Sequence, residues 1–409
     1  MGGRRGPEVA PPEQVQTAGA QSQERRGQRP VPRTRPLWGP SPDHGPRTTG
    51  IATKIKEATE MLPGFGSSGF RDMQMDNRNN ALGVKLLKEA GVNVTPRQLE
   101  VYWGNTCQQS CIYCDAHYSS TIQQEEKRFG DFDTEGVEIS DRWKKNPKIE
   151  EHTELLFKWF EKHLHKLHKI FVMGGEPFLQ KETFRFIEFL EKGSYPDLTL
   201  VFFSNHNIEH ERFKKWMDRL EVLQKSGRLD KIQIFFSCDA LGKEGEYVRT
   251  GLDLNVALKN FEYILHNTSF DQGINSALTV TAVPGMPAMV KYINECSKIK
   301  PIYWSMMKAN QYEIGPREYM YPGIFGSKIN DWGLREAVEM FDTNSYGHPD
   351  SVKVNHKKFM EGNIKEFESR DPNPIRMKQF NIYLKELDRR RGTDWTKIYP
   401  QMYKEIKNL

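Results

Sequence analysis

The stretch WGNTCQQSCIYC, Trp103–Cys114, contains three of the five cysteines of this 409-residue chain, at Cys107, Cys111 and Cys114. It directly follows a strand-like run at 98–102, so the three cysteines are expected on a loop at the end of a strand. Thiolates this close together repel one another unless a metal neutralises them, and soft sulfur ligands select zinc, copper(I) or iron–sulfur clusters. The CxxxCxxC spacing therefore indicates a metal site.

The fourth ligand distinguishes two kinds of metal site. His117 lies three residues beyond Cys114 and could complete a Cys3His set, which is typical of structural zinc in a non-catalytic protein. A [4Fe–4S] cluster held by only three cysteines instead leaves one iron open to a ligand from outside the protein. An open coordination position of this kind is typical of a catalytic site rather than of a metal that only stabilises a loop.

Composition and charge exclude several classes of protein. Hydrophobic residues make up 37% and charged residues 28% of the chain, and no run approaches the roughly 18 apolar residues of a membrane span. The net charge is +5, of which +4 falls within residues 1–50 (eight Arg against four acids), so the remainder is nearly neutral and does not indicate a nucleic-acid partner. Five cysteines with three clustered make no disulfide framework, which predicts a cytoplasmic protein.

The N-terminal 60 residues differ from the rest. Residues 1–50 contain nine of the 23 prolines and no cysteine. A segment of this composition cannot bury enough apolar surface to offset its ordering entropy, so a disordered Arg/Pro-rich extension is expected over 1–60. The alternatives are an RNA-binding arm, or a start codon misassigned upstream of Met61.

From residue 80 onward, short apolar runs alternate with amphipathic segments, which predicts βα units and a parallel sheet. The expected strands are 98–102, 169–173, 198–203, 232–236, 275–283 and 302–307. The expected helices of this part are 81–90, 151–167, 181–192, 211–223, 255–266 and 289–298. Six such units predict an α/β fold with an open (β/α)6 partial TIM-type barrel over 80–310.

Two further segments lie outside this repeat. The polar stretch 115–150 has few apolar residues, and a loop of that length indicates a functional lid or an insertion. Residues 311–409 are expected to form a mostly helical C-terminal cap over the barrel mouth, with helices at 359–367 and 377–390, the second stopped by Gly392.

Marked residues follow the expected strands at their carboxyl ends, where ligands bind in parallel α/β folds. The candidates are Gly174, Gly175 and Glu176 of the GGEP sequence, Ser204 and Asn205, and Ser237 and Asp239. Strand side chains alternate, so Ser237 and Asp239 share a face and could bind a ribose, while Cys238 packs on the other face. The alternative for Asp239 is to cap the following helix.

Arg249, in the segment Glu246–Gly251, is a further candidate. Arginine suits bidentate binding of a carboxylate, and a buried arginine at the barrel rim could hold a cofactor carboxylate. A surface ion pair is the alternative.

The cysteine spacing, with an aromatic residue before the last cysteine, resembles the signature of the radical S-adenosylmethionine (radical SAM) family, and GGEP resembles that family's motif for the methionine amino group. The resemblance implies one [4Fe–4S] cluster on Cys107, Cys111 and Cys114, with SAM chelating the open iron. It implies reductive cleavage of SAM to a 5′-deoxyadenosyl radical that abstracts hydrogen from a substrate. It places Tyr113 along the adenine, and Glu176 with the backbone of the two glycines at the methionine amino group. The family's fold is also an open (β/α)6 barrel.

GGEP, the Ser-Cys-Asp strand end, Glu246–Gly251 and the late DRRRGTDW sequence, Asp388–Trp395, are similar to radical SAM proteins termed twitch domain-containing, from marine bacteria and phages. That similarity covers roughly residues 95–405. No cysteine occurs after Cys296, so we expect a degenerate twitch-like region without a cluster of its own. The expected partners are an electron donor such as flavodoxin or ferredoxin, and a substrate that is a peptide or protein side chain or a small molecule. Nucleic-acid modification through the basic N-terminal arm is a third hypothesis.

Overall fold

The computed structural model of the chain describes residues 96–409, apart from 131, 135–136, 140–148, 309–317 and 342–349. All described residues belong to one compact unit, Ala58–Leu409. The predicted extension over 1–60, the predicted helix at 81–90 and the expected boundary between barrel and cap near 310 lie outside the described residues.

Six parallel strands form the central sheet. Their order is β1-β5-β6-β7-β9-β10, so strands that follow one another around the sheet also follow one another along the chain. The strands are β1 (Gln98–Tyr102), β5 (Lys169–Met173), β6 (Tyr195–Ser204), β7 (Leu229–Ser237), β9 (Asp271–Leu278) and β10 (Ile302–Lys308). This arrangement confirms the predicted α/β fold with an open (β/α)6 partial barrel.

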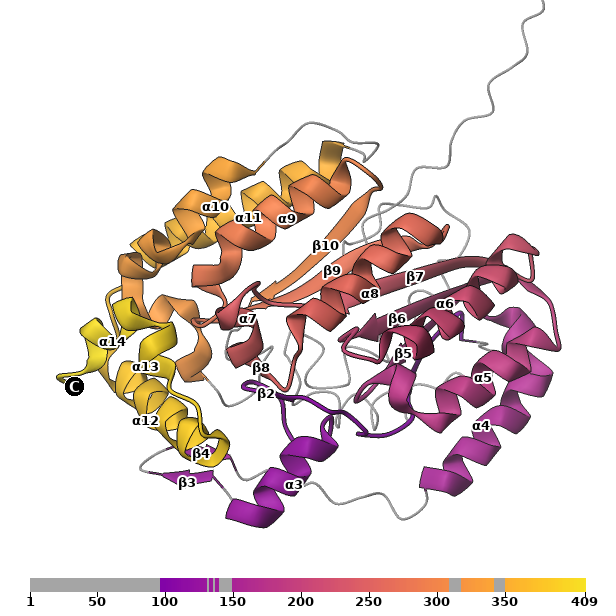
Figure 1. Cartoon of the computed structure of the whole chain (residues 1–409), viewed down its shortest axis with the longest axis horizontal. Coiled ribbons are helices and arrows are strands. Elements are labelled where there is room, and N and C mark those ends of the chain that lie inside the picture. Colours follow the sequence, from indigo (N-terminus) through magenta and orange to yellow (C-terminus); the bar gives the residue numbers. More distant parts are fainter. Residues whose placement is uncertain (1–95, 131, 135–136, 140–148, 309–317, 342–349) are drawn as a thin grey trace, which may run out of the picture. The chain divides into compact units, whose positions relative to one another are not determined.

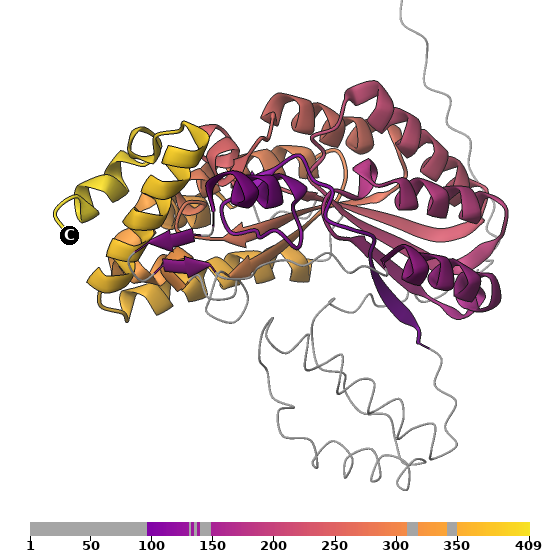
Figure 2. The same ribbon diagram turned by 90° about the horizontal axis from the view of Figure 1, so that it is seen from below.

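Helices connect these strands and lie together on one side of the sheet (Figures 1 and 2). They are α4 (Ile149–His163), α5 (Lys181–Glu191), α6 (His210–Lys225), α8 (Leu254–Asn267) and α9 (Met286–Ser297). Helix α8 shows why they form: Asp253 caps its first turn by accepting the N–H of Val256, and Ala257, Phe261 and Ile264 recur at helical spacing on the buried face.

The expected strand at 275–283 is wrong at its C-terminal end, because β9 stops at Leu278. Beyond it the backbone turns: Ala282 donates its N–H to the carbonyl of Thr279 (3.1 Å), and the hydroxyls of Thr279 and Thr281 hydrogen-bond each other (3.0 Å). A short 3-10 helix, Val283–Gly285, then leads into α9. Apolar and β-branched residues continued past the strand, so composition alone could not locate its end.

The described part of the polar stretch 115–150 contains secondary structure that the sequence did not predict. It contains α3 (Ser120–Phe129) and a hairpin of β3 (Phe132–Thr134) and β4 (Val137–Ile139). Ser119 caps α3 by accepting the N–H of Ile122, and Ile122 is the only buried residue of that helix. A helix that buries one side chain lacks the apolar periodicity by which helices are predicted.

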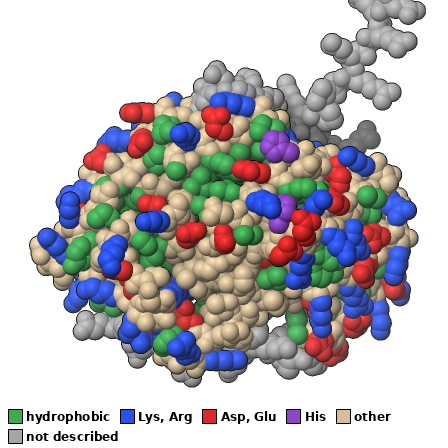
Figure 3. Space-filling view, viewed as in Figure 1, with side chains coloured by type: hydrophobic (Ala, Val, Ile, Leu, Met, Phe, Trp, Pro, Cys, Tyr) green, Lys and Arg blue, Asp and Glu red, His purple; other side chains and the backbone are tan. Residues whose placement is uncertain are grey.

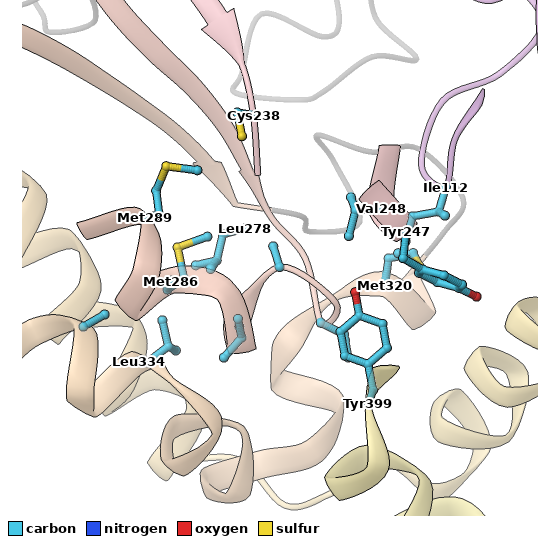
Figure 4. Close-up of a cluster of buried hydrophobic side chains, with 14 of the residues drawn as sticks. Ile112, Cys238, Tyr247, Val248, Leu278, Met286, Met289, Met320, Leu334 and Tyr399 are labelled. Carbon is cyan, nitrogen blue, oxygen red and sulfur yellow. The ribbon is translucent and has the colours of Figure 1, made fainter. Parts of the chain in front are cut away.

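Two hydrophobic clusters support the sheet. The first packs β1, β5 and β6 against α4, α5 and α6. The second joins the other half of the sheet to the C-terminal helices, and Figure 4 shows part of it, with Ile112, Tyr247, Val248 and Tyr399 close to one another. Because Ile112 lies inside the cysteine stretch, the C-terminal helices and the cysteine stretch share one core.

The C-terminal region is helical, as predicted. Its helices are α10 (Leu334–Met340), α11 (Asp350–Glu368), α12 (Pro374–Arg391), α13 (Trp395–Ile398) and α14 (Pro400–Ile406). Helix α12 ends where expected, at Gly392 in the left-handed conformation (φ 68°).

Across the described ranges, none of the helices combines the length and the hydrophobicity required to span a bilayer. On the face drawn in Figure 3, basic and acidic side chains are interspersed. That face therefore carries no continuous basic surface.

Candidate functional site

The cysteine loop is held on both sides by neighbouring elements. A two-residue strand within it, β2 (Ser110–Cys111), pairs antiparallel with β8 (Arg249–Thr250), and Ile112 donates its N–H to the carbonyl of Val248 (2.9 Å). On the other side the carbonyl of Cys107 accepts hydrogen bonds from the hydroxyls of Ser120 (3.1 Å) and Thr121 (2.7 Å) at the start of α3. The loop is therefore hydrogen-bonded to elements that lie up to about 140 residues away in the sequence.

The three thiols differ in exposure. Cys107 and Cys111 are buried, with 9% of each residue exposed, and Cys114 is half-buried. Burial, and then the neighbouring Cys111, raise the pKa of Cys107 to about 12. Burial also raises the pKa of Cys111, although the positive charge of Arg249 opposes this shift. These thiols need a cationic ligand to become thiolates at neutral pH, which a metal supplies.

The GGEP strand end packs directly against the cysteine loop. The N–H of Glu176 donates to the carbonyl of Thr106 (2.7 Å). Gly174 has φ 89°, which favours glycine, and a Cβ at Gly175 would lie 2.8 Å from the carbonyl carbon of Asn105, closer than side chains come to backbone. The two sequence motifs thus form one structural unit at the carboxyl end of the sheet.

The carboxylate of Glu176 is fully buried among neutral donors. Its Oε1 accepts hydrogen bonds from the hydroxyl of Ser204 (2.8 Å) and the N–H of Phe178 (3.1 Å), and its Oε2 accepts the N–H of Asn205 (2.7 Å). Burial raises the pKa of Glu176 to about 7 although these bonds oppose the shift. Glu176 therefore joins the ends of β5 and β6, the strands that precede two of the predicted site segments.

Asn205 extends this contact to the cysteines. Its side-chain Nδ2 donates to Sγ of Cys107 (3.8 Å), and its Oδ1 accepts from Nε2 of Gln108 (3.1 Å). The next residue, His206, has φ 54°, which is uncommon for a residue with a side chain, and its buried ring stacks on Phe236 (4.9 Å). Burial lowers the pKa of His206 to about 3, so the ring is neutral and acts in packing.

Asp239 and Arg249 form a buried pair next to the loop, and the half-buried Tyr113 of the loop joins them. The guanidinium of Arg249 donates from Nη2 to Oδ1 of Asp239 (3.1 Å), its Nε lies 2.9 Å from Oδ2, and its Nη1 donates to Sγ of Cys111 (3.8 Å). The hydroxyl of Tyr113 donates to Oδ2 of Asp239 (2.7 Å). Burial opposes the charge of Arg249, but Asp239 raises its pKa well above the ordinary value, so the guanidinium stays charged.

This geometry decides two of the alternatives raised by the sequence. Asp239 does not cap a helix, because α7 (Lys243–Val248) begins after Gly242 without a side-chain cap, whereas Oδ1 of Asp239 accepts the N–H of Ala277 (2.7 Å). The surface ion pair suggested for Arg249 is also wrong, because Arg249 is only 7% exposed. The pair is internal to the site, and contact of either residue with a cofactor stays a prediction.

Two other residues considered in the sequence, Ser237 and Cys238, take less part in the contacts around the cysteine loop. Ser237 is half-buried at the end of β7, and no side-chain hydrogen bond is found for it within the described residues. Cys238 points into the second hydrophobic cluster, as predicted, and its thiol donates to the carbonyl of Ala240 (3.3 Å) (Figure 4).

His117 does not join the cysteines in a zinc site. It is exposed, and its Nδ1 lies 3.4 Å from the carboxylate of Asp115. Among the residues with described positions, no set of three or more His, Cys, Asp or Glu side chains is arranged to hold a metal ion. A compact Cys3His zinc site is therefore absent from this arrangement.

The residues fit a four-iron cluster better than a single ion. Each cysteine of such a cluster binds a different iron, so the three sulfurs need not converge on one point. The donors are soft sulfurs on a single loop, and two of them receive N–H groups from Asn205 and Arg249 that favour negative charge on sulfur.

Sequence reasoning missed several residues that hold the loop. Gln108 donates to Asn205 and to the carbonyl of Asn207 (2.6 Å), and its position between the first two cysteines was the available signal. From α12, the hydroxyl of Tyr383 donates to the carbonyl of Ile112. Arg391, at the end of α12, forms a partly buried ion pair with Glu125 (2.9 Å). Nothing in the spacing of these residues marked them as neighbours.

Comparison with known proteins gives only distant similarity. No protein-family model matches the chain, and no curated protein matches it. SuiB of Streptococcus suis bound to the precursor peptide SuiA aligns at 14% identity over 69% of this chain and 56% of its own, with a TM-score of 0.37.

Two further solved structures show similarity at the same level. SuiB bound to S-adenosylmethionine aligns at 15% identity over 65% of this chain and 53% of its own, with a TM-score of 0.35. TYW1 with a lysine–pyruvate adduct aligns at 15% identity over 60% of this chain and 74% of its own, with a TM-score of 0.32. The alignment thus spans little more than half the length of SuiB, and similarity this low carries no information on activity, which must come from the residues themselves.

Proposed function

We propose that this chain is a radical SAM enzyme that binds one [4Fe–4S] cluster on Cys107, Cys111 and Cys114. The observation that carries the proposal is the direct packing of the GGEP strand end on the cysteine loop at the carboxyl edge of six parallel strands. A structural metal needs neither this contact nor the buried polar groups around it. When bound, the cluster supplies one electron that breaks a carbon–sulfur bond of SAM, giving methionine and a 5′-deoxyadenosyl radical that takes hydrogen from a substrate.

The residues around the loop have separate roles in this proposal. The three cysteines hold the cluster, and the missing fourth cysteine leaves the position at which the amine and carboxylate of SAM bind. Glu176 has unused acceptor capacity on Oε2 and no cationic side chain among its hydrogen-bond partners, so a bound ammonium group would favour its ionised form. The backbone of Gly174 and Gly175 can approach a ligand closely for the same reason that it approaches the cysteine loop.

Other assignments extend this proposal. Tyr113 would lie along the adenine, and Ser204, Asn205, Ser237 and Asp239 would line the site of the nucleoside and methionine parts. The substrate would be a peptide or protein side chain or a small molecule, and the electron donor a flavodoxin or ferredoxin in the cytoplasm. The C-terminal helices would shield the radical from water, which they can do because α12 already contacts the cysteine loop.

Anaerobic reconstitution with iron and sulfide, reduction by dithionite and assay for 5′-deoxyadenosine test the proposal. Wild-type protein should contain about four irons and form 5′-deoxyadenosine from SAM, since one cluster is expected. Cys111→Ala should lose both properties, whereas Cys296→Ala, which changes a buried cysteine of α9, should keep both. Cluster-loaded wild-type protein that never cleaves SAM, even with added cell extract as a source of substrate, would contradict the proposal.

The remaining alternative is a non-catalytic metal protein. It predicts tightly bound zinc with no iron, and metal analysis of protein purified without oxygen distinguishes the two. The exposed position of His117 disfavours the zinc site.

A further inference from the structure

The sulfurs of Cys107 and Cys111 each receive a hydrogen-bond donor from outside the cysteine loop. Nδ2 of Asn205 donates to Sγ of Cys107, and Nη1 of Arg249 donates to Sγ of Cys111, each at 3.8 Å. Both donors are more than nine-tenths buried, with 5% of Asn205 and 7% of Arg249 exposed. One follows β6 and the other begins β8, so they reach the loop from separate elements.

Each donor is held in place by its other polar atoms. Oδ1 of Asn205 accepts from Nε2 of Gln108 (3.1 Å) and from the N–H of Asn207 (2.9 Å). These bonds, together with a second donation from Nδ2 to Oε1 of Gln108 (3.4 Å), fix the amide so that Nδ2 also faces the sulfur. Arg249 is fixed through Nη2 and Nε by Asp239. The N–H groups are therefore preorganised toward the two sulfurs.

Such donors change the energy of an electron added to an iron–sulfur cluster. Reduction makes the cluster and its sulfur ligands more negative, and an N–H dipole or a positive charge beside a sulfur stabilises that negative charge. The reduction potential of iron–sulfur clusters is accordingly set in part by hydrogen bonds to the sulfurs and by exclusion of water.

We propose that Asn205 and Arg249 set the reduction potential of the cluster by donating hydrogen bonds to the sulfurs of Cys107 and Cys111. The inference rests on the proposed function, because it requires that these sulfurs bind a cluster. Both residues act through the ligand sulfurs and are positioning residues. For Arg249 this role differs from the binding of a cofactor carboxylate, because two of its three nitrogens already face Asp239 and the third faces sulfur.

The test is a redox titration of reconstituted protein, monitored by the EPR signal of the reduced cluster. Asn205→Asp keeps the shape of the side chain and the Oδ1 acceptor, removes the donor to Cys107 and adds a carboxylate charge, which the matched control also adds. Its cluster should be at least tenfold harder to reduce at a given potential, which is a shift of about 59 mV to lower potential for one electron. Asn207→Asp is the matched control: it makes the same chemical change two residues away, at a side chain that donates to the carbonyl of Gly251 (2.7 Å) rather than to sulfur. The reduction potential of Asn207→Asp should shift from the wild-type value by clearly less than that of Asn205→Asp.

A second variant tests the other donor independently. The double substitution Arg249→Met with Asp239→Asn replaces a neutral ion pair by a neutral pair, so no buried charge is left unpaired. Because Met cannot donate to Cys111, the potential should again fall. This variant decides the question if Asn205→Asp fails to hold a cluster.

The possible outcomes distinguish a failure of the proposed function from a failure of the role inferred for Asn205 and Arg249. If the wild type assembles no [4Fe–4S] cluster, the proposed function fails and this inference fails with it. If the wild type holds a cluster whose potential is the same in the Asn205 and Arg249 variants, only this inference is overturned. A lowered potential in either variant, with the Asn207 control close to wild type, supports it.

Discussion

Two buried carboxylates flank the cysteine loop, and their partners differ. Glu176, after β5, is surrounded by the neutral donors of Ser204, Asn205 and Phe178, whereas Asp239, after β7, is paired with the guanidinium of Arg249. The first carboxylate has no cationic side chain among its hydrogen-bond partners and its pKa rises to about 7, while the second is already neutralised from within the protein.

The difference in partners indicates that the two carboxylates, both at the carboxyl edge of the sheet, have different roles. A buried carboxylate without a cation is unfavourable when ionised, and a cationic ligand relieves that penalty. A buried carboxylate with its own arginine instead fixes the arginine, which then faces Cys111. In the proposed function, Glu176 would therefore bind the ligand, and Asp239 would support the cluster through Arg249.

The largest effect is expected at the ion pair. Arg249→Ala leaves Asp239 buried and unpaired, so the free energy of unfolding should fall by about 3–5 kcal/mol in chemical denaturation. The matched control is Arg335→Ala, which removes an exposed arginine that pairs with the carboxylates of Asp331 and Glu368, and should leave stability unchanged within error. Equal effects of the two variants would show that Arg249 and Asp239 are not buried together.

The raised pKa of Glu176 predicts a pH dependence. Its protonated form is favoured in the folded state, so its contribution to stability is complete below about pH 4.5 and is lost as the pH rises through about 7. Between pH 5 and pH 8, the free energy of unfolding of the wild-type apoprotein should fall by on the order of 3 kcal/mol more than that of Glu176→Gln. Denaturation of both proteins at each pH measures the difference.

The control for this pH dependence is Glu386→Gln. Arg389 is the main cause that lowers the pKa of Glu386 to about 2, so its titration lies below the range tested. This variant should follow the wild-type curve between pH 5 and pH 8. Parallel curves for wild type and Glu176→Gln would mean that Glu176 is ionised at no cost in the fold.

A smaller effect is expected from the packing of the strand end on the loop. Gly175→Ala places a methyl group against the backbone of Asn105 and Thr106, and should lower stability by about 2 kcal/mol while reducing cluster content. Gly362→Ala in α11 is the control, because no atom lies within 4 Å of the added carbon, and it should be neutral or stabilising. Gly175→Ala with wild-type stability and cluster content would mean that the loop and the strand end are not in contact.

The smallest effect is expected from Tyr113, which joins the pair of Asp239 and Arg249. Tyr113→Phe removes the hydroxyl that donates to Asp239 and should lower the free energy of unfolding by about 1.5 kcal/mol. The exposed Tyr403 of α14, whose ring contacts Trp395, provides the comparison, since Tyr403→Phe removes a surface hydroxyl. If the two variants unfold alike, Tyr113 does not contribute to holding Asp239.

The sequence predicted the sheet well, because each strand was a short apolar run followed by an amphipathic helix. β1 and β5 have the predicted bounds, and the other strands differ mainly at their ends. Helix α3 was missed because it buries only Ile122, and the end of β9 was missed because Thr279 and Thr281 are good strand formers that here form a turn.

The sequence pointed to several residues that the fold brings to the cysteine loop, but not to their contacts. Loop position and residue type pointed to Glu176, Asn205, Asp239 and Arg249. That Arg249 pairs with Asp239, and that Arg391 reaches Glu125, depends on segments far apart in the sequence being folded together. A single sequence holds no local pattern for such pairs.

The EPR spectrum of the dithionite-reduced, reconstituted protein, recorded with and without SAM, tests directly whether the three cysteines hold a cluster that binds SAM. If three cysteines hold a cluster whose open iron lies beside the Glu176 strand end, adding SAM should change the g values of the cluster signal. Glu176→Ala should weaken that response while the cluster itself remains. A spectrum that does not change with saturating SAM, or protein that binds zinc in place of an iron–sulfur cluster, would contradict the assignment of the three cysteines to a SAM-binding cluster.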